Sequence, residues 1–259
     1  MRKLAICTAA ALGALTAVYA WAYLGEVVGS FPKPELRLFG LTRSDRYLYG
    51  LEYYSNHVFI MDPYNGSIYS SWPVRRATTP RGIAYTPPSY IWVSCASTKY
   101  VYRCDARNGS IYSSWRADLK YGPYGMAPQS KGDGGKGAAV LFSAGQATEY
   151  EYNCCRHNIT TGSIVSYFRI WRMETDIAWD YRNAAAWLWD TDRTVKGYRL
   201  SGSSIASFWV PHVSPRGLAY YGEYIWVACA GNRVVYRIHC PAGIGVYPAS
   251  VGRVKALFR

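Results

Sequence analysis

A segment of about 40 residues occurs twice in this chain, and this repetition constrains the fold more than any other feature. The first copy has Pro-Arg-Gly-Ile-Ala-Tyr at 80–85 and Tyr-Ile-Trp-Val at 90–93, and the second has Pro-Arg-Gly-Leu-Ala-Tyr at 215–220 and Tyr-Ile-Trp-Val at 224–227. Runs rich in Tyr, Val, Ile and Trp between Gly, Pro and Asn are typical of short strands joined by turns. The repeat therefore predicts a four-stranded β-propeller blade, and its Trp is expected to pack between neighbouring blades.

Two glycine markers give the number of blades. A Gly-Ser turn recurs at Gly66, Gly109, Gly162 and Gly202. The glycine that opens each unit recurs at Gly40, Gly82, Gly125 and Gly217, and Asp176 takes its place in the remaining unit. These intervals predict five repeats, at 39–72, 80–115, 123–168, 173–209 and 215–250. We therefore expect an all-β fold that is a five-bladed β-propeller, with six blades as the alternative.

The N-terminal segment, residues 1–24, differs from the repeats. Two basic residues precede an uncharged apolar run at 4–24, which ends near an Ala-Trp-Ala sequence. These features are typical of a secretory signal peptide, although a run of about 20 apolar residues is also long enough for a membrane anchor. We expect residues 25–38 to be a linker or lead-in strand, and residues 39–259 to be the propeller. The predicted location is extracytoplasmic, either secreted or attached to the cell surface.

The chain has 7 cysteines, one of which lies in the apolar leader. The other six are Cys95, Cys104, Cys154, Cys155, Cys229 and Cys240. An even number in an exported domain favours disulfides, and the simplest pairing joins Cys95 to Cys104 and Cys229 to Cys240. A zinc site is the competing interpretation, but it requires closely spaced ligand pairs and the chain has no Cys-x-x-Cys. We therefore expect disulfides and no metal.

Three sequences match the Asn-x-Ser/Thr pattern of N-glycosylation, at Asn65, Asn108 and Asn158. Asn65 and Asn108 each precede a glycine, and Asn-Gly is a strong hairpin signal by itself. Asn158 is followed by Ile-Thr and has no such explanation from the sequence. All three are predicted as candidate glycan acceptors in exposed turns.

The formal net charge is +13, and the chain contains 25 Tyr and 10 Trp. A basic, aromatic surface suits an acidic polysaccharide or another polyanion, and a protein partner at the cell surface is also consistent with it. The alternative is that the basic residues are dispersed over solvent-facing strand positions without a common partner. Membrane contact is expected only through residues 4–24, and a homo-oligomer or larger assembly is compatible with this composition.

The first strands of propeller blades line a central channel, so residues just before the opening glycine should meet at one mouth of it. These positions hold Phe39, Arg81, Tyr124, Thr175 and Arg216, with Glu174 and Asp176 flanking in the fourth unit. We predict Arg81, Tyr124, Glu174, Asp176 and Arg216 as a ligand-binding set, because paired Arg residues bind carboxylate or phosphate well. The alternative is that the Arg residues pair with the acids and close the channel.

No catalytic residue or cofactor is predicted. The four histidines, at 57, 157, 212 and 239, fall at non-equivalent blade positions, so the sequence does not gather them with a nucleophile and an acid. A Gly-x-Gly-x-x-Gly match at 132–137 precedes a predicted strand, whereas a dinucleotide site requires a helix there.

The order Pro-Arg-Gly-Ile-Ala-Tyr, Tyr-Ile-Trp-Val, Val-Tyr-Arg and Gly-Ser-Ile resembles the repeat of NHL and streptogramin-lyase-like propellers, from residue 39 to about 250. This resemblance implies a propeller that is usually six-bladed. It also implies either a secreted or surface binding protein, or a lyase or lactonase that uses His and acidic residues with a divalent metal at the channel mouth.

The sequence thus predicts an exported, non-catalytic binding or cell-surface structural protein, with a preference for an acidic ligand. One alternative is a metal-dependent lyase or lactonase-like hydrolase that uses Glu174 and Asp176. Another is a subunit of a surface assembly that keeps its apolar N-terminal segment.

Overall fold

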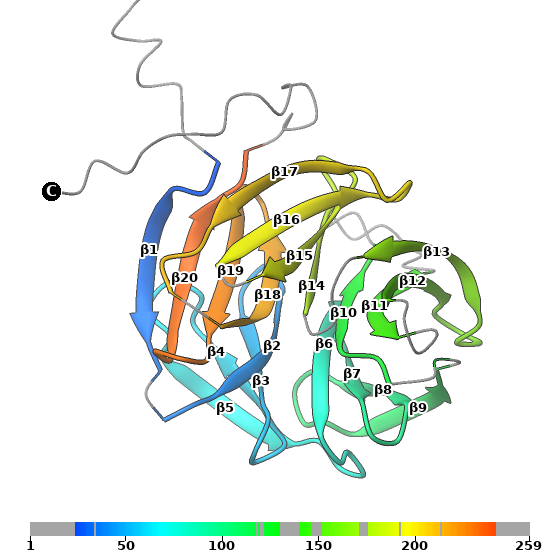
Figure 1. Cartoon of the computed structure of the whole chain (residues 1–259). Helices are drawn as coiled ribbons and strands as arrows, with labels where there is room; N and C mark the ends of the chain where they lie inside the picture. The colour runs from blue at the N-terminus through cyan, green and yellow to red at the C-terminus, as the bar shows by residue number, and fades with distance from the viewer. Residues whose placement is uncertain are drawn as a thin grey trace, which may run out of the picture.

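The computed structural model describes residues 24–33, 35–117, 119, 122–129, 140–146, 152–170, 176–191, 193–212 and 214–241. The regular elements of this part of the chain are strands, which form five antiparallel four-stranded sheets (Figure 1). Sheet 1 contains β2 (Leu38–Arg43), β3 (Leu48–Glu52), β4 (His57–Met61) and β5 (Ile68–Pro73). Sheet 2 contains β6 (Pro80–Thr86), β7 (Tyr90–Cys95), β8 (Tyr100–Asp105) and β9 (Ile111–Arg116).

The other three sheets follow the same order along the chain. Sheet 3 contains β10 (Gly125–Pro128), β11 (Val140–Gln146), β12 (Tyr152–Asn158) and β13 (Ile164–Ile170). Sheet 4 contains β14 (Ile177–Asp180), β15 (Ala185–Thr191), β16 (Thr194–Arg199) and β17 (Ser204–Trp209). Sheet 5 contains β18 (Pro215–Tyr221), β19 (Tyr224–Cys229), β20 (Val234–His239) and β1 (Val27–Pro32).

The first strands of the sheets surround one axis. β2 lies beside β6 and β18, β10 lies beside β6 and β14, and β14 lies beside β18, which completes a ring (Figure 1). Inner strands are buried on both faces, as in β3, whereas the outer strand β5 buries only its Trp72. This is a β-propeller arrangement, as the repeats predict.

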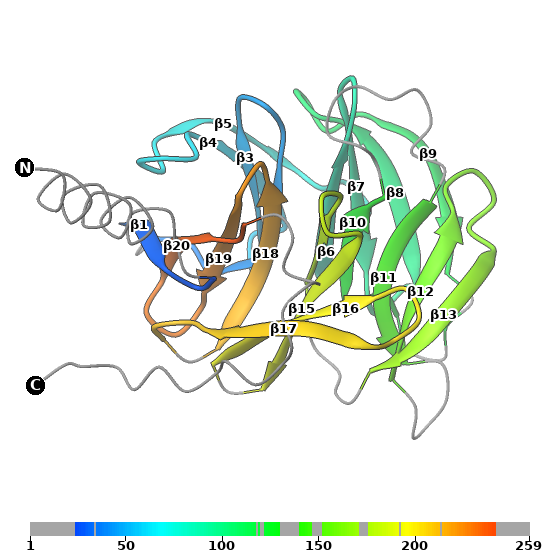
Figure 2. The same cartoon turned by 90° about the horizontal axis from the view of Figure 1, so that it is seen from above.

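The ring closes with a strand from the opposite end of the chain. β1 pairs antiparallel with β20, with Ser30 opposite Tyr236 (Figures 1 and 2). The predicted lead-in segment is therefore the outer strand of sheet 5. The expectation that residues 215–250 would supply all four strands of the fifth unit is wrong, because β1 is the fourth strand of this sheet. The hydrogen bonds between β1 and β20 close the ring.

The outer strands carry a contact that repeats around the whole propeller. In each case a large aromatic side chain of one sheet packs against a positive-φ glycine next to the outer strand of the following sheet. The five pairs are Phe31 with Gly66, Trp72 with Gly109, Trp115 with Gly162, Phe168 with Gly202, and Phe208 with Gly25. A side chain on any of the first three glycines would overlap the aromatic ring, so glycine is required for the packing as well as for the turn.

The tryptophans of the repeated Tyr-Ile-Trp-Val also lie between sheets, as predicted. Trp92 of sheet 2 packs with Met126 and Cys155 of sheet 3. Trp226 of sheet 5 packs with Leu41 of sheet 1, and its indole N–H donates to the carbonyl of Pro63 at 2.9 Å. The core is thus a series of inter-sheet layers rather than one central cluster.

The structure contradicts the predicted disulfides. All six cysteines of the propeller are free and buried. Cys104 lies opposite Ile91 in the β7–β8 pairing, so Cys95 is about four residues, or about 13 Å, further along the strand. A disulfide needs Cα atoms within about 7 Å, so this pairing cannot form.

The remaining cysteines are separated in the same way. Cys229 lies opposite Val234, whereas Cys240 follows the far end of β20. Cys154 and Cys155 are neighbours on β12 and pack into different inter-sheet layers. Burial raises the pKa of the thiols of Cys95, Cys104, Cys155 and Cys229 to about 12, as expected of small hydrophobic core residues.

The predicted leader, residues 1–24, lies outside the described residues except for Leu24. Within the described ranges no helix has the length and hydropathy needed to cross a bilayer.

Candidate functional site

The centre of the propeller holds one carboxylate, Asp176, which is 1% exposed. Its Oδ2 accepts hydrogen bonds from the backbone N–H of Leu41 at 2.7 Å and of Leu218 at 3.0 Å, and its Oδ1 accepts from Met126 at 3.3 Å. These amides belong to β2, β18 and β10, so one side chain of sheet 4 links the first strands of three other sheets. Burial raises the pKa of Asp176 well above its usual range, and the backbone N–H groups oppose that shift.

The sister positions of Asp176 are glycines for a steric reason. A Cβ on Gly82 would lie 2.8 Å from the Cα of Gly125, so the backbones of adjacent first strands are in contact there. Asp176 is the exception, and its side chain occupies the axis that the other units leave free. The structure therefore places Asp176 inside the propeller, with its oxygens engaged by backbone donors, rather than at an accessible mouth.

One end of the channel is formed where the first strands begin. The guanidinium carbon of Arg81 lies 4.6 Å from the ring centroid of Tyr53, 5.2 Å from that of Phe39 and 6.0 Å from that of Tyr124. Phe39 and Tyr53 stack with their centroids 4.8 Å apart. Arg81 has no ion pair or hydrogen bond among the described residues, and its buried Nε is without a partner.

Arg216 reaches the same aromatic cluster from sheet 5. Its guanidinium carbon lies 5.3 Å from the Phe39 centroid and 5.4 Å from that of Trp189. The structure thus brings Arg81 and Arg216 against Phe39, and Tyr124 near Arg81. Glu174, the other acid of the predicted set, lies outside the described residues. We call this aromatic cluster with its two Arg residues the arginine end of the channel.

The opposite end has features that the sequence analysis missed. A small cavity of about 60 Å³ is lined by residues of all five sheets. Arg43 is 8% exposed there, with its guanidinium carbon 4.6 Å from the Tyr221 centroid and 5.0 Å from that of Trp226, and it donates to the carbonyl of Ser44. Burial lowers the pKa of Arg43. In the sequence, the one sign that Arg43 lies at this end of the channel is its position at the end of a first strand.

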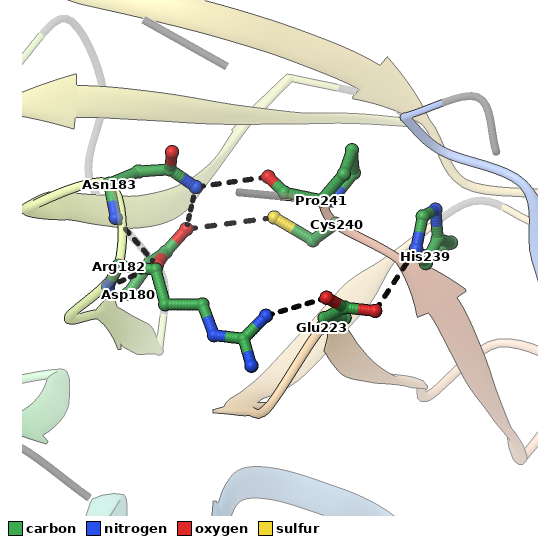
Figure 3. A network of polar contacts seen from close by, with 7 residues as sticks. All are labelled: Asp180, Arg182, Asn183, Glu223, His239, Cys240 and Pro241. Carbon is green, nitrogen blue, oxygen red and sulfur yellow. Dashed lines mark hydrogen bonds and ion pairs between the residues drawn. The ribbon is translucent and has the colours of Figure 1, made fainter. Parts of the chain in front are cut away.

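A polar network beside this end fastens the last strand to sheet 4 (Figure 3). The buried carboxylate of Asp180 accepts from the side-chain amide of Asn183 at 2.7 Å and from the thiol of Cys240 at 3.7 Å. The same Asn183 amide donates to the carbonyl of Pro241 at 3.1 Å. Arg182 pairs with Glu223 at 2.7 Å between the loops of sheets 4 and 5. These contacts explain why Cys240 is buried without a disulfide.

Asn65 and Asn108 lie in turns before outer strands, and Asn158 is the last residue of β12, where such a turn begins. The side-chain Oδ1 of Asn65 accepts from the backbone N–H of Ser67, and that of Asn108 accepts from Ser110. Asn158 accepts from the backbone N–H of Thr160 and Thr161 at 2.8 and 3.1 Å. This third residue therefore has a turn role after all, equivalent to that of the aspartates at 62 and 105, which cap the same turn. Glycosylation of any of them stays a prediction.

The described residues contain no group of three or more His, Cys, Asp or Glu that could hold a metal ion. The histidines are dispersed, as expected from their positions. His157, for example, is buried, stacks on Trp115 with centroids 5.3 Å apart, and contacts the carbonyl of Gly162.

Comparisons with known proteins agree with this fold. No protein-family model matches the sequence, and no curated protein sequence matches it. Among solved structures, the chain is similar to a Myxococcus xanthus glutaminyl cyclase, with a TM-score of 0.64 and 7% identity over 83% of this chain and 95% of that one. It is also similar to Kuenenia stuttgartiensis hydrazine synthase, with a TM-score of 0.51 and 10% identity over 86% and 99% of the two chains.

A chain of a nidogen–laminin complex gives a TM-score of 0.53 and 11% identity over 74% of this chain and 72% of that one. At such identities the similarity shows a β-propeller fold and nothing of the activity. The narrower NHL or streptogramin-lyase-like assignment remains a prediction from the repeat sequence.

Proposed function

We propose that this chain is an exported, five-bladed β-propeller that binds an acidic ligand at the arginine end of its channel and is not an enzyme. The observation that carries the proposal is the environment of Arg81. Its guanidinium is held against three aromatic rings, while no described residue supplies an acid or an acceptor for its N–H groups.

Such an environment suits an anion for two reasons. Aromatic faces fix the guanidinium by cation–π attraction without neutralising its charge, so its planar set of donors remains available. A carboxylate or a sulfate can then accept two parallel hydrogen bonds from one Arg, and Arg216 supplies a second charge against the same Phe39 ring. The net charge of +13 would draw an acidic ligand toward the surface at low salt.

The alternative of a metal-dependent lyase or lactonase-like hydrolase is not favoured. It needs Asp176 as a ligand, and the oxygens of Asp176 are already engaged by three backbone N–H groups of neighbouring sheets. The proposal of export rests on the apolar run at 4–24, and the same run carries the alternative of a surface assembly that keeps this segment as an anchor.

The test uses the full chain and a heparin hexasaccharide as the acidic probe, with affinity measured by calorimetry at about 50 and 200 mM salt. The variant Arg81→Gln/Arg216→Gln removes two charges at the channel end. The control, Arg75→Gln/Arg116→Gln, removes two charges from exposed positions. We expect at least a tenfold loss of affinity in the first variant and less than a threefold loss in the control.

Equal losses in the two variants would mean that the basic residues act as a dispersed charge, and the arginine end would not be a site. Absence of heparin binding by the unmodified chain at both salt concentrations would reject the acidic-ligand function itself.

A further inference from the structure

The face opposite to the arginine end carries a second, larger concavity. A groove of about 530 Å³ lies between sheets 1 and 2, where the loops that follow β2 and β6 meet β5 and the turn before β9. Its volume lies within the range of about 300–1,000 Å³ that small-molecule sites occupy. We call it the tyrosine groove and define it by Tyr47, Tyr49, Tyr69, Tyr85, Arg46 and Arg107.

The four tyrosines form an ordered wall. Tyr49 and Tyr85 are parallel, with centroids 5.6 Å apart and planes 9° apart, and Tyr47 meets Tyr69 edge-on at 5.4 Å. Tyr69 is 60% exposed, yet its hydroxyl is held by the carboxylate of Asp62 at 3.1 Å. Rings that are already fixed lose little conformational entropy when a ligand packs on them, so the wall is preorganised for binding.

The charges of the groove are few and mainly positive. Arg46 and Arg107 form no ion pair among the described residues, although the charge of Arg107 acts on the nearby Asp105, and Asp45 is the only acid that lines the groove. Asp45 already accepts a hydrogen bond from the hydroxyl of Tyr221 at 3.1 Å. Burial raises the pKa of Tyr49 to about 12, and a hydrogen bond with Ser44 and the Arg107 guanidinium oppose the shift, so this phenol is neutral at physiological pH.

We infer that the tyrosine groove binds a short acidic oligosaccharide that contains hexuronate residues. A pyranose ring has apolar C–H faces and a rim of hydroxyl groups, which matches the apolar ring and polar tip of tyrosine. Two Arg residues suit the carboxylates of such a chain. A single-stranded nucleic acid would also stack on the rings, but it carries a phosphate at every residue and needs a groove with a more continuous positive charge.

This site goes beyond the proposed function, because it shares no residue with the arginine end. The test measures the binding of tetragalacturonate to the full chain by calorimetry, with its methyl ester as the uncharged probe. Tyr69→Ala is compared with Tyr112→Ala, which is matched closely: Tyr112 is 58% exposed, its hydroxyl donates to Asp105 at 3.1 Å, and it does not line the groove.

We expect tetragalacturonate to bind at least tenfold more weakly to Tyr69→Ala and within twofold of the unmodified chain to Tyr112→Ala. The variant Arg107→Gln should weaken binding of the acid about fivefold and leave binding of the methyl ester unchanged. Arg81→Gln/Arg216→Gln should leave the part of tetragalacturonate binding that depends on Tyr69 intact, which separates this site from the arginine end.

Equal effects of the two Tyr variants, or no binding of tetragalacturonate at all, would overturn the inference. So would binding of a dT10 oligonucleotide that depends on Tyr69 and exceeds that of the saccharide. Loss of tetragalacturonate binding only in Arg81→Gln/Arg216→Gln would place the saccharide at the arginine end, which rejects the groove and supports the proposed function.

Discussion

The contacts between aromatic rings and glycines at the outer strands form what we call the rim of the propeller. One of them can be tested by adding a methyl group to its glycine. Gly109 has a φ of +72°, and a Cβ there would lie 2.3 Å from Cε3 and 2.8 Å from Cδ2 of the Trp72 indole. Gly222 has a φ of +65°, and a Cβ there would meet nothing within 4 Å. Gly109→Ala and Gly222→Ala therefore impose the same kind of backbone strain, but only the first forces the neighbouring sheet to move.

The two contributions to the free energy of unfolding can be estimated separately. Placing Ala in the left-handed region costs about 1–2 kcal/mol, and both variants should lose this amount. Overpacking a rigid core contact adds about 1–3 kcal/mol, and displacement of Trp72 also weakens the hydrogen bond from its indole N–H to the carbonyl of Ala106, worth about 1 kcal/mol. Gly109→Ala should therefore be less stable than Gly222→Ala by about 2–4 kcal/mol.

The assay is urea unfolding of the full chain followed by tryptophan fluorescence, with the same variants repeated on a Trp72→Leu background. Leu lacks the indole atoms that overlap the new methyl group, so the added loss caused by Gly109→Ala should fall to the value seen for Gly222→Ala. If the two glycine variants are equally stable, or if Trp72→Leu does not reduce the loss, the ring contact does not hold the sheets together.

The remaining predictions concern the axis and the thiols. Asp176→Asn replaces an acceptor oxygen with a donor facing a backbone N–H, and urea unfolding at pH 7 should show a loss of about 1–3 kcal/mol; an unchanged midpoint would contradict the role of Asp176 at the axis. Because burial raises the pKa of Asp176, the free energy of unfolding should fall as pH rises from about 4 through the folded-state pKa, and fall less in Asp176→Asn. The six propeller cysteines should resist iodoacetamide in the native protein at pH 8 and all react after denaturation without reductant, whereas bridged peptides in mass spectrometry would contradict the structure.

The repeats predict most of the fold because turn and strand signals are local. Asn-Gly and the strand runs identify sheets 1 and 2 almost to the residue. Local signals could not predict which segment forms the fourth strand of sheet 5, because β1 and its partner β20 are about 200 residues apart in the sequence. The disulfide prediction failed for a related reason: it counted cysteines, whereas the strand register decides which of them meet.

The candidate site was only partly predictable. Equivalent positions in the repeat correctly suggest that Arg81 and Arg216 approach a common point, since both lie against Phe39. The role of Asp176 could not be found from spacing, because its partners are backbone amides that any sequence would supply. The tyrosine groove was missed because Tyr69 and Tyr112 have the same local sequence, and only the neighbouring sheets determine that one of them lines a cavity.

The rim and the axis of this propeller differ in a way that separates stability from binding. The rim uses one contact five times, and Gly25, near the first of the described residues, completes the series with Phe208. The axis varies between units: the position before the opening glycine holds Phe39, Arg81, Tyr124, Thr175 or Arg216, and Asp176 takes the place of the glycine in the fourth unit. Because the rim and the Asp176 hydrogen bonds already fix the sheets, the side chains at the channel ends can vary without loss of the fold. The side chains of the arginine end are therefore expected to serve binding rather than stability.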